Sequence, residues 1–442
     1  MTRLFDATFA RGGAAVAVSD SAWFDALLDV EAALARAAAS VGLVPTTAAD
    51  AVTAACAEPA GLDLASVVAR SAEAGNPVPP LVRVLQTAVG DRDAVAVHVG
   101  ATSQDVLDTA LMLLARRALA AIRADLRAAA DAAADLAGAH RDDVVMGRTL
   151  MQQALPTTFG LTAAGWLAGL DGAAARLHAV DAALPVQYGG AVGTLAASGG
   201  AGIEVRAALA AELGLTTTPV AWHTVRLPIA DLAGALGATA GVLATIALDV
   251  VLLAQTEVGE VAEGGPETRG GSSAMPHKRN PVAAISARAC ARRAPGLVAT
   301  LLAAMEQEHQ RAAGAWHSEW PTVTELLSTV GSAAAWLSDC LSGLRPDTGR
   351  MAATVARSRD PQLAAALADA LTPALGRGAA HEAAAAAVRE AAASGRPLAD
   401  VIAARTDVEV PFHTAGAPDV GAAGAQVDAA LASHDARARR NS

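Results

Sequence analysis

Aromatic side chains, charge and cysteine are all scarce in this chain of 442 residues. Only 3% of the residues are aromatic and 17% are charged, while 53% are hydrophobic, so Ala, Leu and Val must build the core. Intrinsic disorder needs low hydrophobicity and high net charge, and this composition excludes it. The net charge of −11 comes without a basic stripe, which excludes a bare nucleic-acid binder. Three cysteines without a C-x-x-C pair are typical of a reducing cytoplasm.

A convincing transmembrane run is also missing. The uncharged stretch 232–248 is shorter than the roughly 20 apolar residues that cross a bilayer, and Ala and Gly supply much of it. We therefore expect this stretch to be a helix buried on all sides inside a bundle. No apolar stretch follows residues 1–6, so we expect no signal peptide.

What the sequence does have is helical periodicity. The segment 102–138 contains no Gly or Pro before its last residue, and its Leu and Ile residues recur at helical spacing. At 1.5 Å per residue, this helix would be about 50 Å long. Further helices are predicted at 21–41, 156–183 and 229–258, and from 281 onward. Several very long, Ala-rich helices predict an all-α fold with a central bundle, because small side chains let helix axes approach closely.

The long helices are apolar on too many faces to be surrounded by solvent. We therefore expect them to be buried against other subunits, and a bundle within a single chain is the alternative. Gly-rich and Pro-rich stretches indicate where domains end. We predict an N-terminal helical domain over 1–99, a central long-helix domain over 100–343 and a C-terminal helical domain over 344–442.

Two polar segments interrupt the first half of the chain. Residues 98–105 read His-Val-Gly-Ala-Thr-Ser-Gln-Asp. One polar residue is enough to cap the N-terminus of the helix predicted at 102–138, so four polar residues and a His are more than capping requires. Residues 147–158 carry an Arg and two adjacent Gln before a Pro at a predicted helix start, and are equally consistent with a polar turn. Because the N-termini of helices bind anions, both segments are candidate anion sites.

A third polar segment, 270–281, reads GGSSAMPHKRNP. Asn280 is a good N-cap and Pro281 a good first helical residue, so the segment runs from a Gly hinge into a positive helix end. Its serines can donate or accept protons, and Lys278 supplies fixed positive charge. This composition is typical of a lid that carries reactive groups over a bound anion. A basic surface loop, the alternative, leaves the paired Ser after paired Gly unexplained.

The third segment resembles the GSSxMPxKxNP signature of the fumarase/aspartase superfamily, a long and specific motif. Segments 98–108 and 147–156 resemble the Thr-Ser-x-Asp and Thr-His-x-Gln segments of that superfamily and occur in the same chain order. The resemblance implies a three-domain, all-α homotetramer in which three subunits assemble each active site. It also implies an enzyme that needs no metal or cofactor, and the ten His form no HExxH motif or zinc-spaced cluster.

Within the superfamily, the chain resembles the 3-carboxy-cis,cis-muconate cycloisomerase branch. The stretches that carry this resemblance are 75–79, 101–105, 222–226 and 308–320. The implied activity adds a muconate carboxylate across a conjugated double bond and closes 4-carboxymuconolactone, in the protocatechuate branch of the β-ketoadipate pathway. Leu150 replaces a His that many lyases use as general acid and that cycloisomerases also lack. Gln153 departs from the branch, which usually carries a His there.

The motifs also imply roles for individual residues. Ser272 would be the catalytic base and would deliver the proton in lactonisation, while Lys278 would supply the positive field that favours its alkoxide. Arg311 occupies the place where related lyases hold an anion with an Arg, and a bidentate grip suits a tricarboxylate substrate. The implied substrate-binding residues are His98, Thr102, Ser103, Arg148, Thr149, Gln152, Gln153, His223, Ser273, Met275, Asn280 and Arg311.

Two alternatives remain open at this point. Leu150 and Gln153 are compatible with another superfamily lyase, one that eliminates fumarate from a substituted succinate such as argininosuccinate or adenylosuccinate. A non-catalytic scaffold that kept the fold is more remote, because the chain retains Ser272, Lys278 and Asn280 together.

Overall fold

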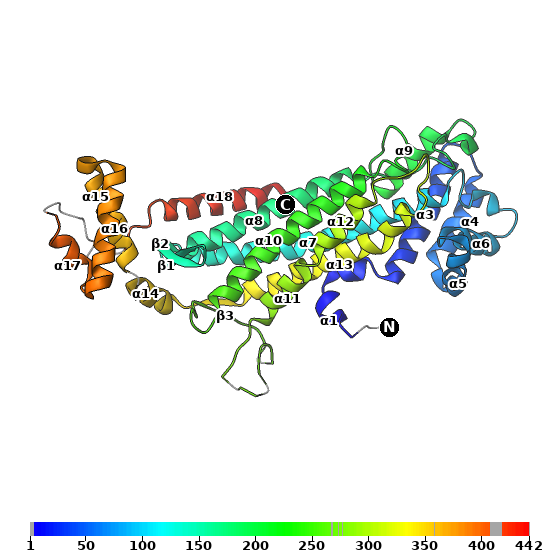
Figure 1. Ribbon diagram of the computed structural model, residues 1–442. Helices are drawn as coiled ribbons and strands as arrows, with labels where there is room; N and C mark the ends of the chain where they lie inside the picture. The colour runs from blue at the N-terminus through cyan, green and yellow to red at the C-terminus, as the bar shows by residue number, and fades with distance from the viewer. Residues whose placement is uncertain are drawn as a thin grey trace. The chain divides into compact units, whose positions relative to one another are not determined.

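The computed structural model describes residues 4–266, 268–272, 274–275, 277–357, 359–406 and 418–441 (Figure 1). Helices dominate this part of the chain, and its strands form two short antiparallel pairs, β1–β2 and β3–β4. The predicted all-α fold is confirmed. The chain divides into two compact units, which we call unit 1 (1–129, 170–248 and 283–339) and unit 2 (130–169, 249–282 and 340–442). The predicted three-domain division stays a prediction.

Within the described ranges, four helices are longer than 24 residues. They are α7 (Ser103–Ala139), α8 (Phe159–Ala183), α10 (Leu227–Leu253) and α13 (Ala315–Ser342). The prediction at 102–138 therefore agrees with the structure within one residue at each end. The prediction at 229–258 is too long, because the chain leaves the helix after Leu253 to reach the Gly259 turn.

Unit 1 is built on α3 (Asp20–Ser40), which buries eleven of its residues, most of them Ala and Leu. Ser19 caps this helix by accepting a hydrogen bond from the Ala22 amide, and α3 packs against α4 and α9. The other elements of this unit are α1 (Asp6–Phe9), α2 (Gly13–Ala17), α4 (Thr46–Ala57), η1 (Pro59–Gly61), α5 (Leu64–Ala74), α6 (Val78–Val89), η2 (Ala94–Ala96), η3 (Ala196–Ser198), α9 (Gly202–Leu213), α11 (Val282–Ala291) and α12 (Ala294–Ala303).

Unit 2 contains a hairpin that the sequence patterns did not predict. Strand β1 (Val144–Thr149) pairs antiparallel with β2 (Gln152–Thr158), and α8 begins only after them, at Phe159. The predicted helix start at Pro156 is wrong, since Pro156 lies inside β2 opposite Met146. The smaller pair joins β3 (Val261–Glu263) to β4 (Leu344–Pro346).

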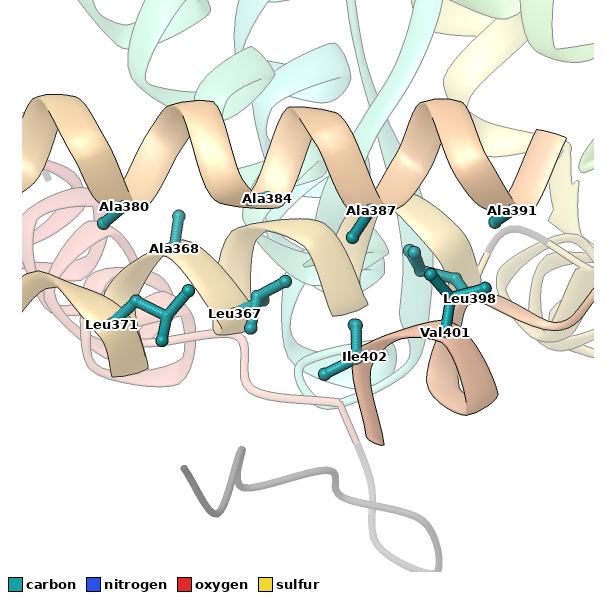
Figure 2. Packing of buried hydrophobic residues seen from close by; sticks show 10 residues of the cluster. All are labelled: Leu367, Ala368, Leu371, Ala380, Ala384, Ala387, Ala391, Leu398, Val401 and Ile402. Atoms are coloured by element: carbon teal, nitrogen blue, oxygen red, sulfur yellow. The ribbon is translucent and has the colours of Figure 1, made fainter. Parts of the chain in front are cut away.

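The C-terminal helices of unit 2 pack through alanines. In α16 (Arg377–Ser394), the buried positions 380, 384, 387 and 391 form one stripe that faces α15 (Arg359–Leu375) and α17 (Leu398–Ala403) (Figure 2). Leu, Val and Ile side chains from those two helices fill the space in front of the stripe. The remaining helices of this unit are α14 (Thr348–Arg357) and α18 (Ala423–Asn441).

Helix α10 is long and apolar enough to cross a membrane by length and composition alone. Only 39% of its most apolar window is buried within the chain, so the prediction that it is buried on all sides is not met by one copy of the protein. Positions 234, 238, 241 and 245 are exposed and carry Gly, Ala, Gly and Thr, which form a stripe of small side chains along the helix.

Candidate active site

The first predicted segment forms the start of α7, in unit 1. The Thr102 amide donates to the Asp105 carboxylate (3.0 Å), and Ser103 and Gln104 are the first two residues of the helix. Their two amides have no acceptor among the residues that the structure describes. Unclaimed amides at a helix N-terminus, together with the helix dipole, favour a bound anion. The geometry here therefore suits a carboxylate ligand.

Arg311 brings a guanidinium group to the same helix start. Its Nη1 donates to Thr102 Oγ1 (2.8 Å), and its guanidinium lies 5.9 Å from the ring centroid of Trp316. Burial lowers the pKa of Arg311, although Asp105 and Asp108 raise it. Arginine keeps its charge in proteins, so this is a half-buried cation next to the Thr102 hydroxyl.

His223, another of the predicted substrate-binding residues, is buried in unit 1. It is 4% exposed, and its Nε2 lies 2.7 Å from Asp105 Oδ1. Since an ionised carboxylate can only accept, Nε2 carries the proton in this pair. The structure therefore brings three predicted binding residues, Thr102, His223 and Arg311, around one carboxylate that was not among them.

His98 precedes this helix in the same unit. Its backbone takes the left-handed conformation (φ 59°), and its amide and ring Nδ1 both contact the carboxylate of Glu31, at 3.0 and 2.7 Å. Burial lowers the pKa of His98, but the charge and hydrogen bond of Glu31 raise it more, so the net shift is upward. Glu31 is fully buried, and the pair fixes the loop that leads into α7.

A buried charge cluster that the sequence reasoning missed lies one turn further along α7. Arg226 is 1% exposed and reaches both oxygens of Asp108 (2.8 and 3.0 Å) and both oxygens of Glu319 (3.0 and 2.5 Å). Trp316 Nε1 also donates to Asp108 (2.9 Å). Asp108 gave a signal, because a charged residue inside the apolar helix predicted at 102–138 is rarely buried unless it is paired.

Arg226→Met is expected to destabilise the protein by about 3–5 kcal/mol, because it leaves two carboxylates buried without their cation. Burial already raises the pKa of Glu319, and Arg226 opposes this shift more strongly than any other group. Removing Arg226 raises that pKa further, so the deficit should shrink as pH falls and the carboxylate takes up a proton. Urea denaturation at several pH values measures this effect.

The matched control for that variant is Arg36→Met. Arg36 pairs with Glu212 at 2.8 Å, but both side chains are more than a third exposed, so its loss should cost at most about 1 kcal/mol. Equal losses for the two variants, or a deficit in Arg226→Met that does not depend on pH, would contradict the role of the buried cluster.

The second predicted segment is the hairpin of unit 2. Arg148 makes two 2.8 Å hydrogen bonds to the carboxylate of Glu260, which is fully buried, so its guanidinium holds the hairpin in place. Thr149, Gln152 and Gln153 lie exposed beside the tip, where Leu150 is 95% exposed. Leu150 and Met151 both take positive φ, which a tight turn requires.

The third predicted segment is a loop of unit 2 with a closed neck. Asn280 donates to the Gly270 carbonyl with its backbone amide (2.8 Å) and with its side chain (3.1 Å). A Cβ on Gly270 would lie 2.4 Å from the Asn280 carbonyl oxygen, so only glycine fits there. Gly271 also forms a bridge with Arg279. The neck therefore joins the two ends of this segment, Gly270–Gly271 and Arg279–Asn280.

Within this loop, Ser272 is half-buried and its Oγ accepts a hydrogen bond from the Met275 amide (3.2 Å). Met275 is 41% exposed and Lys278 is exposed. Ser273 lies outside the described residues. Helix α11 begins at Val282, one residue after Pro281. Among the described residues, no group of three or more His, Cys, Asp or Glu is arranged to hold a metal ion.

A family model described as Lyase matches residues 13–296. The chain therefore belongs to this lyase family, within the fumarase/aspartase superfamily that its motifs resemble, and it is an enzyme. It is 43% identical to the 3-carboxy-cis,cis-muconate cycloisomerase of Pseudomonas aeruginosa over 450 residues, which cover 98% of this chain and 97% of that protein.

Two further similarities bear on function. The crystal structure of the 3-carboxy-cis,cis-muconate lactonizing enzyme from Pseudomonas putida matches with a TM-score of 0.87 at 38% identity, covering 98% of this chain and 99% of that one. The nitrosuccinate lyase of Streptomyces davaonensis is 44% identical over 403 residues, covering 89% of this chain and 85% of that protein.

Proposed function

We propose that the protein is a 3-carboxy-cis,cis-muconate cycloisomerase that forms 4-carboxymuconolactone, acting in the cytoplasm on a small tricarboxylate. The near full-length similarity to the cycloisomerase and the lactonizing enzyme carries this proposal. A carboxylate oxygen of the substrate adds to the conjugated double bond, and the electron pair moves onto the neighbouring carboxylate. Ser272 then delivers a proton to the carbanion carbon. Lys278 stabilises the negative charge that develops, as preorganised donors do in such sites.

The lack of a titratable side chain in residues 149–158 supports this reaction over the alternative lyases. Residues 149–158 contain no titratable side chain, because Leu150 and Gln153 occupy the two positions where a His was expected. An amine or a guanidine leaves as a strong base and needs a general acid. The group that adds or leaves in lactonisation is a carboxylate, whose conjugate acid has a pKa near 4, so it needs no acid. One proton-transfer residue is therefore enough.

The same reasoning gives a second candidate function. Nitrite is also a weakly basic anion that departs without a proton, so elimination of nitrite from nitrosuccinate would need only the base Ser272. The 44% identity with a nitrosuccinate lyase favours testing this reaction beside lactonisation. Elimination from argininosuccinate or adenylosuccinate would need an acid that neither Leu150 nor Gln153 provides.

We propose further that the enzyme is a homotetramer whose active sites are shared between subunits. The exposed stripe on α10 supports this assembly, because glycine inside a helix costs about 0.5–1 kcal/mol relative to alanine. A Cβ added to Gly234 or Gly241 would meet nothing within 4 Å in the chain, so nothing inside one copy requires either glycine. A second copy's helix packed against this stripe would require both of them.

Gln153→His tests whether the missing acid matters. If lactonisation needs no acid at this position, the variant should keep the same product and at most gain an ionisation near pH 6.5 in its pH–rate profile. The measurement is kcat/KM against pH for both proteins on 3-carboxy-cis,cis-muconate. A gain of about 100-fold or more would mean that lactonisation needs an acid that the natural chain lacks, which would contradict the proposed function and favour elimination of nitrite, the reaction that needs only the base.

A further inference from the structure

Four hydrogen-bond donors converge on the carboxylate of Asp105. Oδ1 accepts from the Gly189 amide (3.0 Å) and from His223 Nε2 (2.7 Å), while Oδ2 accepts from the amides of Gly190 (2.8 Å) and Thr102 (3.0 Å). Asp105 is only 2% exposed, so water hardly competes for these bonds. Each oxygen thus has two protein donors.

An ordinary helix start explains only one of these four bonds. A side chain at the third helical position often accepts a bond from the N-cap amide, and Asp105 does this for Thr102. The other three donors come from segments 84 to 118 residues away in the sequence. Asp105 therefore joins the start of α7, the turn at 189–190 and the segment around His223.

The packing around the carboxylate leaves little freedom for these segments. A Cβ on Gly189 would lie 2.4 Å from the Ala221 Cβ and 2.9 Å from His223 Cε1. Gly100, with φ 64°, is equally confined, since a Cβ there would lie 2.5 Å from the Tyr188 hydroxyl. Backbone and side chains approach closely only because these positions are glycine.

The residue that this arrangement fixes is Thr102. Its amide is held by Asp105, its hydroxyl accepts the bond from Arg311, and the unclaimed amides of Ser103 and Gln104 follow it. We propose that Asp105 is a positioning residue, which orients Thr102, and through it Arg311, to grip a carboxylate of the substrate. This proposal rests on the proposed function, since it takes the ligand of this helix start to be a carboxylate of the tricarboxylate substrate.

Asp108 provides a matched comparison. It lies on the same helix three residues later and is fully buried, but its partners are Arg226, Trp316 and two glutamine side chains. It has no hydrogen bond to Thr102 or to the 189–190 turn. Asp105 should therefore govern substrate binding, whereas Asp108 should govern stability.

The test compares Asp105→Asn with Asp108→Asn. In Asp105→Asn, an NH2 group replaces one acceptor oxygen and faces the donors that used it. We expect KM for 3-carboxy-cis,cis-muconate to rise at least 10-fold, and hydrogen exchange at the amides of Thr102, Gly189 and Gly190 to accelerate at least 10-fold. In Asp108→Asn, we expect KM to stay within 3-fold, exchange at those amides to be unchanged and the melting temperature to fall.

The possible outcomes separate the two proposals. If Asp105→Asn lowers the melting temperature but leaves KM and amide exchange unchanged, Asp105 is a structural residue and the inference is overturned. If the wild-type enzyme does not turn over carboxymuconate, the proposed function fails, and amide exchange still reports on Asp105. If Asp105→Asn does not fold, His223→Leu and His223→Gln replace it: removal of one donor should raise KM, and Gln, which retains an N–H, should restore part of it.

Discussion

Ser272→Ala is expected to abolish turnover and leave the assembly intact. The methyl side chain of alanine can neither donate nor accept a proton. The hydrogen bond that Ser272 Oγ accepts is local, because its donor is the Met275 amide three residues away. Its loss should therefore not unfold the protein. The measurements are kcat on carboxymuconate and the elution volume of the purified variant on size-exclusion chromatography.

Ser394→Ala is a suitable control for that variant. Ser394 is an exposed serine whose hydroxyl donates locally to the Glu390 carbonyl, so the chemical change is the same but the position is remote in sequence from every motif. It should keep wild-type kcat. If Ser272→Ala kept more than about a tenth of wild-type kcat, the substitution would have raised the activation free energy by less than about 1.4 kcal/mol. That increase is too small for the loss of a proton-transfer residue.

Lys278→Met is expected to lower kcat by about 100- to 1,000-fold, the usual cost of losing a preorganised charge donor. Its exposed side chain fills no core, so the melting temperature should change little. The composition adds a reason for its importance: Lys278 is the only lysine beside 32 arginines in the chain. Where arginine serves everywhere else, one retained lysine indicates a position that needs a compact ammonium group.

Lys278→Arg sharpens this experiment. It keeps the positive charge but replaces the compact ammonium with a planar fork, so we expect it to recover at most part of the lost kcat. A variant with Met that retains wild-type kcat but melts at a lower temperature would make Lys278 a structural residue. Full activity in the Arg variant would show that charge alone is sufficient.

The long helices could be predicted from sequence because their signals are local. The segment 102–138 is periodic, lacks Gly and Pro, and begins with a polar N-terminus, and α7 matches it closely. The β1–β2 hairpin could not be predicted in this way. Pro156 suggests a helix start, whereas here it lies in a two-stranded pair whose register shifts between Met146 and Arg148, so no regular alternation marks the strands.

The site was only partly predictable for a similar reason. Motifs identified Thr102, His223 and Arg311, because each lies in a recognisable polar segment. Asp105 holds His223, and Glu31 holds His98; each carboxylate acts on a group far away in the chain, and no local pattern reveals such contacts. Burial of charge is a tertiary property, so the pairing of Asp108 and Glu319 with Arg226 became visible only in three dimensions.

The most direct test of the central claim is one assay of product formation by the purified enzyme. The protein is incubated with 3-carboxy-cis,cis-muconate while the absorbance of the conjugated diene is followed, and separately with nitrosuccinate, argininosuccinate and adenylosuccinate while fumarate is measured. The account predicts loss of diene absorbance with 4-carboxymuconolactone as product, and no fumarate from argininosuccinate or adenylosuccinate. Fumarate from either of those two substrates, with the diene left intact, would contradict it.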